Sequence, residues 1–312
     1  MEKESAAVRR VAALQVFIGG ACYGANATMC KSAFASGFSW QQVVAGQMWC
    51  SAVLFGVALL VQAARGRGWR RLGARDAAKL VALGFLSCAT SVLYYFAMSL
   101  LPVEVAITLL FQYSWIGLVI QVIETRRAPR PAEVAAAAVI LAGTVFASGV
   151  WRTGLAGFSP LGLLFGFLSG VSCALFLALS GKVTVPCSDA QRGFLVCLGA
   201  SAASLAICPD FIPSGVVFQG MAPYALVMGL FGMLLPVYLF GLGTPHIPAG
   251  MATVLASSEL PAGLFVSMIA LGEPLGPVEW LGVAAILAGV AISQAGEGHS
   301  VRPRRREAEA RG

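Results

Sequence analysis

A carboxylate stands near the middle of one of the most apolar stretches of the sequence. Glu259 is the only side chain of Ile247–Gly272 that can carry a charge. A charged group at the centre of a membrane-spanning helix costs about 2.5–3.5 kcal/mol on insertion scales, so such groups usually face a cavity or a partner. Two roles follow: Glu259 exchanges protons or binds a substrate amine, or it is a protonated side chain hydrogen-bonded between helices.

Other polar and aromatic side chains could complete a binding site with this carboxylate, because binding sites combine aromatic surface with a few polar groups. Lys31 could bind an anionic end of a substrate, or extend its long stem to the outer headgroups. The helical spacing turns Asn26 away from Lys31. Tyr94 and Tyr95 are adjacent, so we expect at most one of them to face a cavity. The predicted site residues are Glu259, Tyr113, Gln112, Asn26, Lys31, Tyr238 and Ser258.

The elements that hold these residues must lie in lipid. The chain of 312 residues is 58% hydrophobic and 11% charged, with a mean hydropathy of +0.81, whereas soluble domains average about 25% charged residues. Because a spanning helix needs about 20 apolar residues, the sequence predicts an all-α integral membrane protein. Ten transmembrane helices are expected, at residues 11–34, 41–63, 77–100, 103–123, 132–150, 160–181, 190–208, 222–242, 249–271 and 278–295.

The net charge of +7 is distributed unevenly along the chain. If the amino terminus is inside, all of the 21 Lys and Arg residues except Lys31 and Arg152 fall in the termini and in the loops on the inner side. This asymmetry follows the positive-inside rule and predicts that both termini are cytoplasmic, in the inner (plasma) membrane. The basic character therefore reports topology, and no nucleic-acid partner is expected.

The two halves of the chain match each other at an offset of 146 residues. The tetrapeptide "ILAG" at 140–143 recurs at 286–289, and Pro102, Pro131 and Gly24 fall on Pro248, Pro277 and Gly170. Each copy contains five predicted spans, so the second copy must enter the membrane from the opposite side. The sequence thus predicts two inverted five-helix repeats, which support alternating access around a site near the midplane. The offset pairs Glu259 with Tyr113, and Asn26 with Ser172.

Two stretches carry a family resemblance. "YGANATMCK" at 23–31 resembles the aromatic-Gly-x-Asn-x-x-x-x-Lys pattern that opens a repeat in the EamA-like drug/metabolite transporters, and 257–293 resembles the end of their second repeat. The likeness covers residues 11–150 and 160–295 as two five-helix repeats. Gln47 stands where these proteins often carry Arg, and the usual Glu-Pro pair is spread over Glu259-Leu260-Pro261. The resemblance implies a small-molecule transporter, and in bacterial members usually an exporter.

These observations favour a secondary transporter, an exporter of small metabolites such as amino acids or amphiphilic compounds, with proton coupling as one option. The sequence contains no GxxxxGK[ST] motif for direct ATP drive. A nucleotide-sugar or lipid-linked carrier is the alternative within transport, although phosphates call for more buried cations than Lys31. A non-transporting sensor or scaffold, and a membrane-embedded enzyme, are alternatives of other classes. No enzyme activity, metal or cofactor is predicted; the expected partners are a small molecule, protons and the lipid bilayer.

Several smaller features carry structural expectations. Gly20-x-x-x-Gly24 and the glycines at 162, 166 and 170 predict that the first and sixth spans form a close pair. Glu273 is expected to cap or pack at a helix end, and Trp40, Trp151 and Trp280 to lie in the interfacial aromatic belt. Residues 296–312 form a charged tail, expected to be cytoplasmic and disordered.

Overall fold

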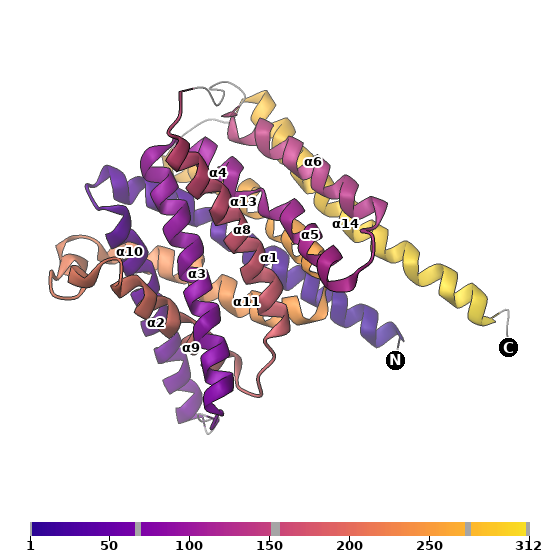
Figure 1. Ribbon diagram of the computed structural model, residues 1–312, viewed down its shortest axis with the longest axis horizontal. Coiled ribbons are helices and arrows are strands. Elements are labelled where there is room, and N and C mark those ends of the chain that lie inside the picture. Colours follow the sequence, from indigo (N-terminus) through magenta and orange to yellow (C-terminus); the bar gives the residue numbers. More distant parts are fainter. Residues whose placement is uncertain (1, 66–69, 151–156, 272–275, 310–312) are drawn as a thin grey trace.

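The computed structural model describes residues 2–65, 70–150, 157–271 and 276–309, and within them the side chains other than those of 2–6, 104, 270, 271 and 294–309. Glu273 and Trp151 lie outside the described residues. The described chain is helical along nearly all of its length (Figure 1). Its main helices are α1 (Glu2–Ala35), α2 (Trp40–Ala64), α3 (Ala74–Leu100), α4 (Val103–Leu110), α5 (Tyr113–Thr125), α6 (Pro131–Ser148), α8 (Pro160–Lys182), α9 (Asp189–Leu205), α10 (Ala222–Gly229), η3 (Leu230–Leu234), α11 (Leu235–Gly243), α12 (Ala249–Ala256), α13 (Glu259–Leu271) and α14 (Pro277–Glu309), with short 3-10 turns η1 (Pro209–Phe211), η2 (Val216–Gln219) and η4 (Thr244–His246).

Helices occupy all ten ranges expected to cross the membrane. Among the described residues, seven segments are long and apolar enough to do so: Trp40–Ala64, Ala74–Leu100, Val105–Thr125, Pro131–Ser148, Pro160–Lys182, Ala222–His246 and Ala249–Ile269. The other three ranges are α1, α9 and the apolar part of α14, Pro277–Ser293. The description of these three as membrane spans stays a prediction.

Helix starts follow local sequence signals. Ser39 and Gln42 form a capping box at the start of α2: the Gln42 N–H donates to Ser39 Oγ at 3.3 Å, and the Ser39 N–H donates to Gln42 Oε1 at 3.0 Å. Proline opens α6, α8 and α14. At the first helical position the missing N–H costs nothing, since that donor would have no helical partner.

Two of the predicted spans are each divided into two helices. The range 103–123 divides into α4 and α5, and the range 249–271 into α12 and α13. In the second, Pro261 has no N–H to donate to the Ser257 carbonyl, which weakens the helix at that turn. In the first, backbone bonds tighten to i−3 spacing: the Gln112 N–H donates to the Leu109 carbonyl and the Ser114 N–H to the Phe111 carbonyl.

The predicted span 222–242 is also irregular. A π-turn, η3, separates α10 from α11. Pro236 cannot donate to the Gly232 carbonyl, which instead accepts the Gln47 side-chain N–H from α2 at 2.8 Å. Ser51 of the same helix donates to the Gly229 carbonyl at 3.2 Å. Side chains of α2 therefore satisfy the carbonyls that this irregular helix leaves open.

The prediction that the first and sixth spans form a close pair is wrong. The glycines of α1 face α12 and α13: a Cβ at Gly20 would lie 2.6 Å from the Ala256 carbonyl oxygen, and Gly24 lies directly against Gly263. In α8, a Cβ at Gly170 would lie 2.8 Å from the Leu110 carbonyl oxygen of α4. Small residues thus allow close approach, as expected, but each helix approaches a broken helix of the other half.

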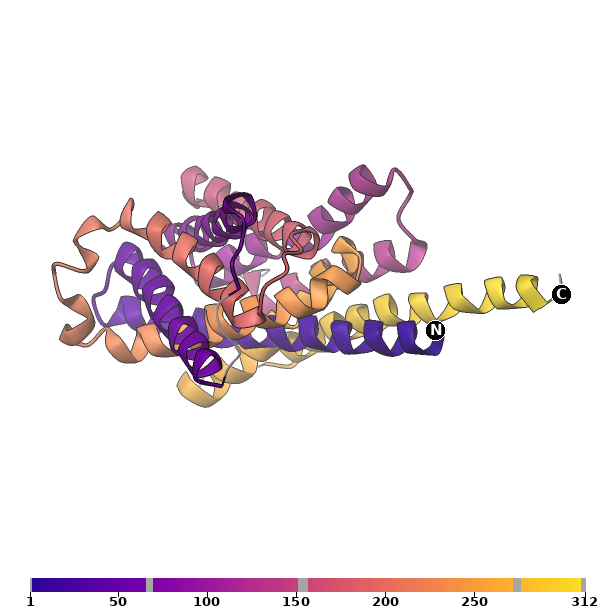
Figure 2. The same cartoon turned by 90° about the horizontal axis from the view of Figure 1, so that it is seen from below.

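The helices form a central group with two flanking pairs. α6 runs beside α14 at one edge and α2 packs on α9 at the other (Figures 1 and 2). The N-terminal end of α1 and the C-terminal end of α14 lie at the same end of the molecule in both views. The backbone of α14 continues as a helix to Glu309, so the expected disorder of the tail is wrong over 296–309.

Candidate functional site

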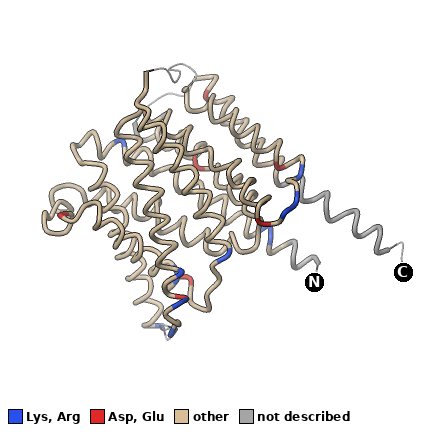
Figure 3. Tube along the Cα trace, viewed as in Figure 1, with Lys and Arg blue, Asp and Glu red and all other residues tan. Residues whose placement is uncertain are grey.

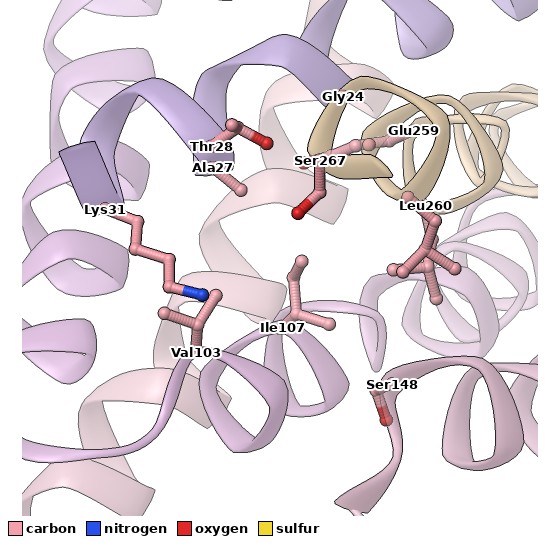
Figure 4. Close-up of a pocket in the computed structure, with 12 residues that line it drawn as sticks. Gly24, Ala27, Thr28, Lys31, Val103, Ile107, Ser148, Glu259, Leu260 and Ser267 are labelled. Atoms are coloured by element: carbon pink, nitrogen blue, oxygen red, sulfur yellow. The ribbon is translucent and has the colours of Figure 1, made fainter. Parts of the chain in front are cut away.

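Two cavities lined by described residues share Glu259, and the larger of this pair lies between α1, α4 and α13, with the end of α6 at its edge. Its volume is about 110 Å³. The apolar part of the lining comes mainly from Ala27, Val103, Ile107, Leu260 and Leu264. Lys31 lies at one end with its amine near Val103, and the hydroxyls of Thr28 and Ser267 face the space between the helices (Figure 4). This cavity combines an apolar wall with a few polar groups, which is typical of ligand sites.

The smaller cavity lies between α1, α3, α8 and α11, and its volume is about 50 Å³. Ser87, Thr90, Ser91, Tyr94 and Tyr95 of α3 line one wall. Their positions recur at intervals of three and four, which places them along one face of the helix. Rings from α1, α8 and α11 form much of the rest: Tyr23, Phe176 and Phe240. The lining also includes Asn26, Leu110, Cys173 and Glu259.

Glu259 lines both cavities. It is the first residue of α13, directly after the break in the ninth predicted span. Tyr23, Tyr113 and Cys173, from α1, α5 and α8, lie within electrostatic reach of its carboxylate. The break therefore places an ionisable group where four helices converge, with open volume on two sides.

A buried hydrogen-bond network borders the smaller cavity. The Asn26 side-chain N–H donates to Tyr95 Oη at 2.5 Å, and Tyr95 Oη donates to Gln47 Oε1 at 2.8 Å. Asn26 is 7% exposed, while Gln47 and Tyr95 are fully buried. Because Gln47 also donates to the Gly232 carbonyl, the network joins α1, α2, α3 and the π-turn. It fixes the Tyr95 ring in the cavity wall.

The predicted site residues separate into two groups. Glu259, Asn26 and Lys31 line the cavities, with Asn26 in the smaller and Lys31 in the larger. Tyr113 is fully buried beside Glu259. The other three are not among the residues that line either cavity: Gln112, Tyr238 and Ser258.

Those three residues have local roles in the structure. Gln112 donates to the Thr108 carbonyl and accepts from Trp115 within the break of its own helix. Ser258 donates to the Phe17 carbonyl of α1 at 2.6 Å. Tyr238 is 38% exposed on the outside of α11.

The expectation that only one of Tyr94 and Tyr95 faces inward is wrong. Both line the smaller cavity, with ring centroids 5.8 Å apart. Adjacent helical residues point about 100° apart, and a cavity in the angle between two neighbouring helices touches both. Tyr23 and the hydroxyls of α3 were not among the predicted site residues, although the spacing of Ser87, Thr90, Ser91 and Tyr94 indicated one polar helix face.

A filled junction joins α5 to α12. Thr253 donates to the Ser114 carbonyl at 3.2 Å, and a Cβ at Gly117 would lie 2.8 Å from Thr253 Cβ. The Gly250 N–H donates to Gln121 Oε1 at 3.0 Å. The Gln121 Nε2 donates in turn to Glu133 of α6 at 3.2 Å. At the matched place in the other half, which we call the hollow junction, residues of α4 and α13 line the larger cavity.

The second half of the chain matches a known family. Residues 160–294 match the model of the EamA-like transporter family. A protein of Archaeoglobus fulgidus named an uncharacterized transporter is 33% identical over 133 residues, which cover 42% of this chain and 47% of that protein. The chain thus spans about half the length of this curated relative in the match.

The fold has a close counterpart among solved structures. One crystal structure of a protein aligns with 91% of this chain and 97% of its own chain, with a TM-score of 0.68 and 20% sequence identity. At this identity the likeness shows the fold alone. The helical arrangement is therefore one that a natural protein has been observed to adopt over its whole length.

Proposed function

We propose that the chain is a secondary transporter, because residues 160–294 match the model of the EamA-like transporter family and seven described segments are long and apolar enough to cross a membrane. Its substrates are small metabolites such as amino acids or amphiphilic compounds, and its direction is export. It works in the inner (plasma) membrane with both termini in the cytoplasm. The described Lys and Arg residues gather toward the side where α1 begins and α14 ends (Figure 3), which supports this orientation.

The two halves act as inverted repeats in this proposal. Support comes from matching irregularities at the offset of 146 residues: α4 and α12 start and end at matched residues, and so do α5 and α13. The residues before each break also match in conformation. Phe111 has φ −65° and ψ −5°, and Ser257 has φ −63° and ψ −6°. Equivalent breaks at equivalent positions are expected when one ancestral unit was duplicated.

Alternating access follows from the unequal junctions. Gly117 contacts Thr253 in the filled junction, and the matched positions in the hollow junction are Gly263 and Ile107, which both line the larger cavity. If the filled junction opens while the hollow junction closes, access to the cavity moves from one side of the membrane to the other. This is the transition that inverted repeats allow. In the proposed orientation the described conformation is closed toward the cytoplasm and hollow toward the outside.

The position of Glu259 at a helix break between two cavities carries the proposal of proton coupling. A carboxylate within a membrane protein that reaches open volume can exchange a proton during the cycle. The titratable groups that face it are Tyr23, Tyr113 and Cys173, and Lys31 lines the larger cavity with it. Protonation on one side and release on the other would link proton entry to substrate exit.

Flux measurements in proteoliposomes test the proposal. A panel of labelled amino acids and amphiphilic compounds is followed with and without an imposed pH gradient. We expect the gradient to stimulate flux in the parent protein and to have no effect in Glu259→Gln, because an amide cannot exchange a proton. Glu124→Gln is the matched control, since Glu124 lies outside both cavities and pairs with Lys182 at 2.7 Å. Undiminished stimulation in Glu259→Gln would exclude this carboxylate as the coupling group.

The nucleotide-sugar or lipid-linked carrier is the weaker alternative. Phosphates are recognised by Arg and Lys side chains. Among the described residues that line the two cavities, Lys31 alone is basic. One amine at the end of an apolar cavity fits a carboxylate better than a diphosphate.

A further inference from the structure

We propose that the smaller cavity is a subsite for a compact cationic head group, so that the substrate is a small amine in its protonated form. This inference rests on the proposed transport function and narrows its substrate class. It comes from three properties of the smaller cavity: its aromatic walls, its charge balance and its size.

Aromatic rings surround much of the smaller cavity. Tyr23 and Phe240 lie with ring centroids 5.9 Å apart at 34°, and Tyr94 and Tyr95 lie 5.8 Å apart at 45°. Phe176 adds a fifth ring. The faces of aromatic rings carry partial negative charge and attract ammonium groups, an effect that strengthens when water is excluded. A box of rings around a small polar space is therefore suited to a cation.

The charged groups of the lining also favour a cation. Glu259 is the one acid of the smaller cavity, and no Lys, Arg or His is among the described residues that line it. The hydroxyls of Ser87, Thr90 and Ser91 can accept hydrogen bonds from an ammonium group. An anionic head group would meet a carboxylate and ring faces with no compensating cation, and would be repelled.

The volumes of the two cavities fit a substrate with a small head group and a larger tail. The smaller cavity has a volume of about 50 Å³, which is room for a few water molecules at about 10–15 Å³ each. A primary ammonium group is therefore the expected occupant, and a bulky quaternary head group is expected to bind less well. The larger cavity, of about 110 Å³, has apolar walls from Ile107, Leu260 and Leu264. Because Glu259 borders both, an amine could contact it from the smaller cavity while its alkyl chain occupies the larger one.

Binding of an amine at this subsite would compete with protonation of Glu259. One carboxylate cannot hold a proton and form an ion pair with an ammonium group at the same time. Tyr23, Tyr113 and Cys173 face the same carboxylate, and none of them supplies a positive charge in its place. The cation and the proton would therefore exchange at Glu259, which gives proton-driven export of an amine a physical basis.

Binding of matched probes to the purified protein in lipid nanodiscs tests the subsite. The probes are n-hexylamine, 1-hexanol, hexanoate and hexyltrimethylammonium, which share a chain and differ in the head. We expect hexylamine to bind, with the other three weaker by about tenfold or more. Titration calorimetry measures this, and nanodiscs without protein correct for partition into lipid.

Variants connect the selectivity to the named residues. Glu259→Gln and Tyr23→Leu should each reduce hexylamine affinity by about tenfold, whereas Tyr23→Phe keeps the ring face and should bind within about threefold of the parent protein. Glu124→Gln should bind as the parent does. The unfolding temperature without ligand identifies any variant that fails to fold, and Tyr23→Phe then still separates the ring from the hydroxyl.

The outcomes separate this inference from the proposed function. Equal or tighter binding of hexanol or hexanoate would overturn the cationic subsite, even if a neutral or anionic metabolite is transported in a pH-dependent way. Selective binding of hexylamine without flux of any amine would uphold the subsite and contradict transport.

Discussion

The filled junction between α5 and α12 and the hollow junction between α4 and α13 occupy matched positions in the two halves of the chain. In the filled junction Gly117 lets Thr253 approach closely, and Gln121 links Gly250 to Glu133. In the hollow junction the residues at the same offset as Gly117 and Gln121 are Gly263 and Ser267, and both line the larger cavity. The two junctions thus have similar backbones and similar breaks, but their side chains make different contacts.

The difference lies in side-chain reach. Gln121 is long enough for its amide to span two neighbouring helices, whereas the serine at 267 has one short hydroxyl. Gln121 accepts a hydrogen bond from the Gly250 N–H. This N–H belongs to the first turn of α12, where backbone donors have no partner within the helix. A single long amide can therefore hold one junction shut and leave the other free to open. Three substitutions test this interpretation.

Gly117→Ala should have the largest effect on the filled junction. Its methyl group would lie 2.8 Å from Thr253 Cβ, and overpacking of this kind costs about 1–3 kcal/mol, or about 5- to 150-fold in the equilibrium for opening. Hydrogen exchange of the backbone amides in Ala249–Ala256 should accelerate accordingly. Gly56→Ala is the control, because a Cβ there has its nearest neighbour at 3.5 Å. Equal exchange in the two variants would show that this close contact does not hold the junction.

Gln121→Leu should open the same junction to a smaller degree. Loss of one hydrogen bond to a backbone donor costs about 0.5–1.5 kcal/mol net, or about 2- to 13-fold faster exchange at the Gly250 amide. The part of the α6–α14 pair beyond the first turn of α6, where Glu133 also loses the Gln121 amide, should exchange as before. Gln219→Leu, on an exposed surface, is the control. Faster exchange spread evenly over the whole protein, or no change at Gly250, would contradict a role for Gln121 in holding the junction.

Ser267→Gln should produce the smallest change, in the hollow junction. It places on α13 the side chain that α5 carries at the matched position, within reach of the first turn of α4. If the new amide accepts a backbone N–H there, exchange at the start of α4 should slow by about two- to fivefold. Ser99→Gln, on the exposed end of α3, controls for the added volume. Faster exchange of α4 would mean that the longer side chain props the junction open.

Composition and periodicity predicted the helical membrane fold and the ranges of the helices, and they drew attention to Glu259, which lines both cavities. The breaks were less accessible to sequence reasoning. Pro261 hinted at the break before α13, but the matched position in the first half is Trp115, and there the break depends on backbone bonds around Gln112 that no local pattern specifies. The repeat offset could have transferred the expectation from one half to the other.

The wall of the smaller cavity shows a second limit. The spacing of Ser87, Thr90, Ser91 and Tyr94 indicated one polar face of α3. This face becomes a cavity wall only together with Tyr23 and Phe240, which come from distant parts of the chain. Gln112 and Tyr238 have the right chemistry for a binding site and lie elsewhere, because a polar side chain can satisfy its own helix or face outward equally well. Pairwise contacts across the fold decide between these roles.

The bond from Gln47 to the Gly232 carbonyl also bears on how the protein is made. A carbonyl left bare in lipid costs several kcal/mol, and Pro236 guarantees that the segment around η3 carries one. During synthesis α2 leaves the ribosome before the segment around η3 does. The Gln47 side chain of α2 is therefore present in the chain when the later helix forms. The first half of the polypeptide thus supplies a hydrogen-bond donor that the backbone of the second half lacks.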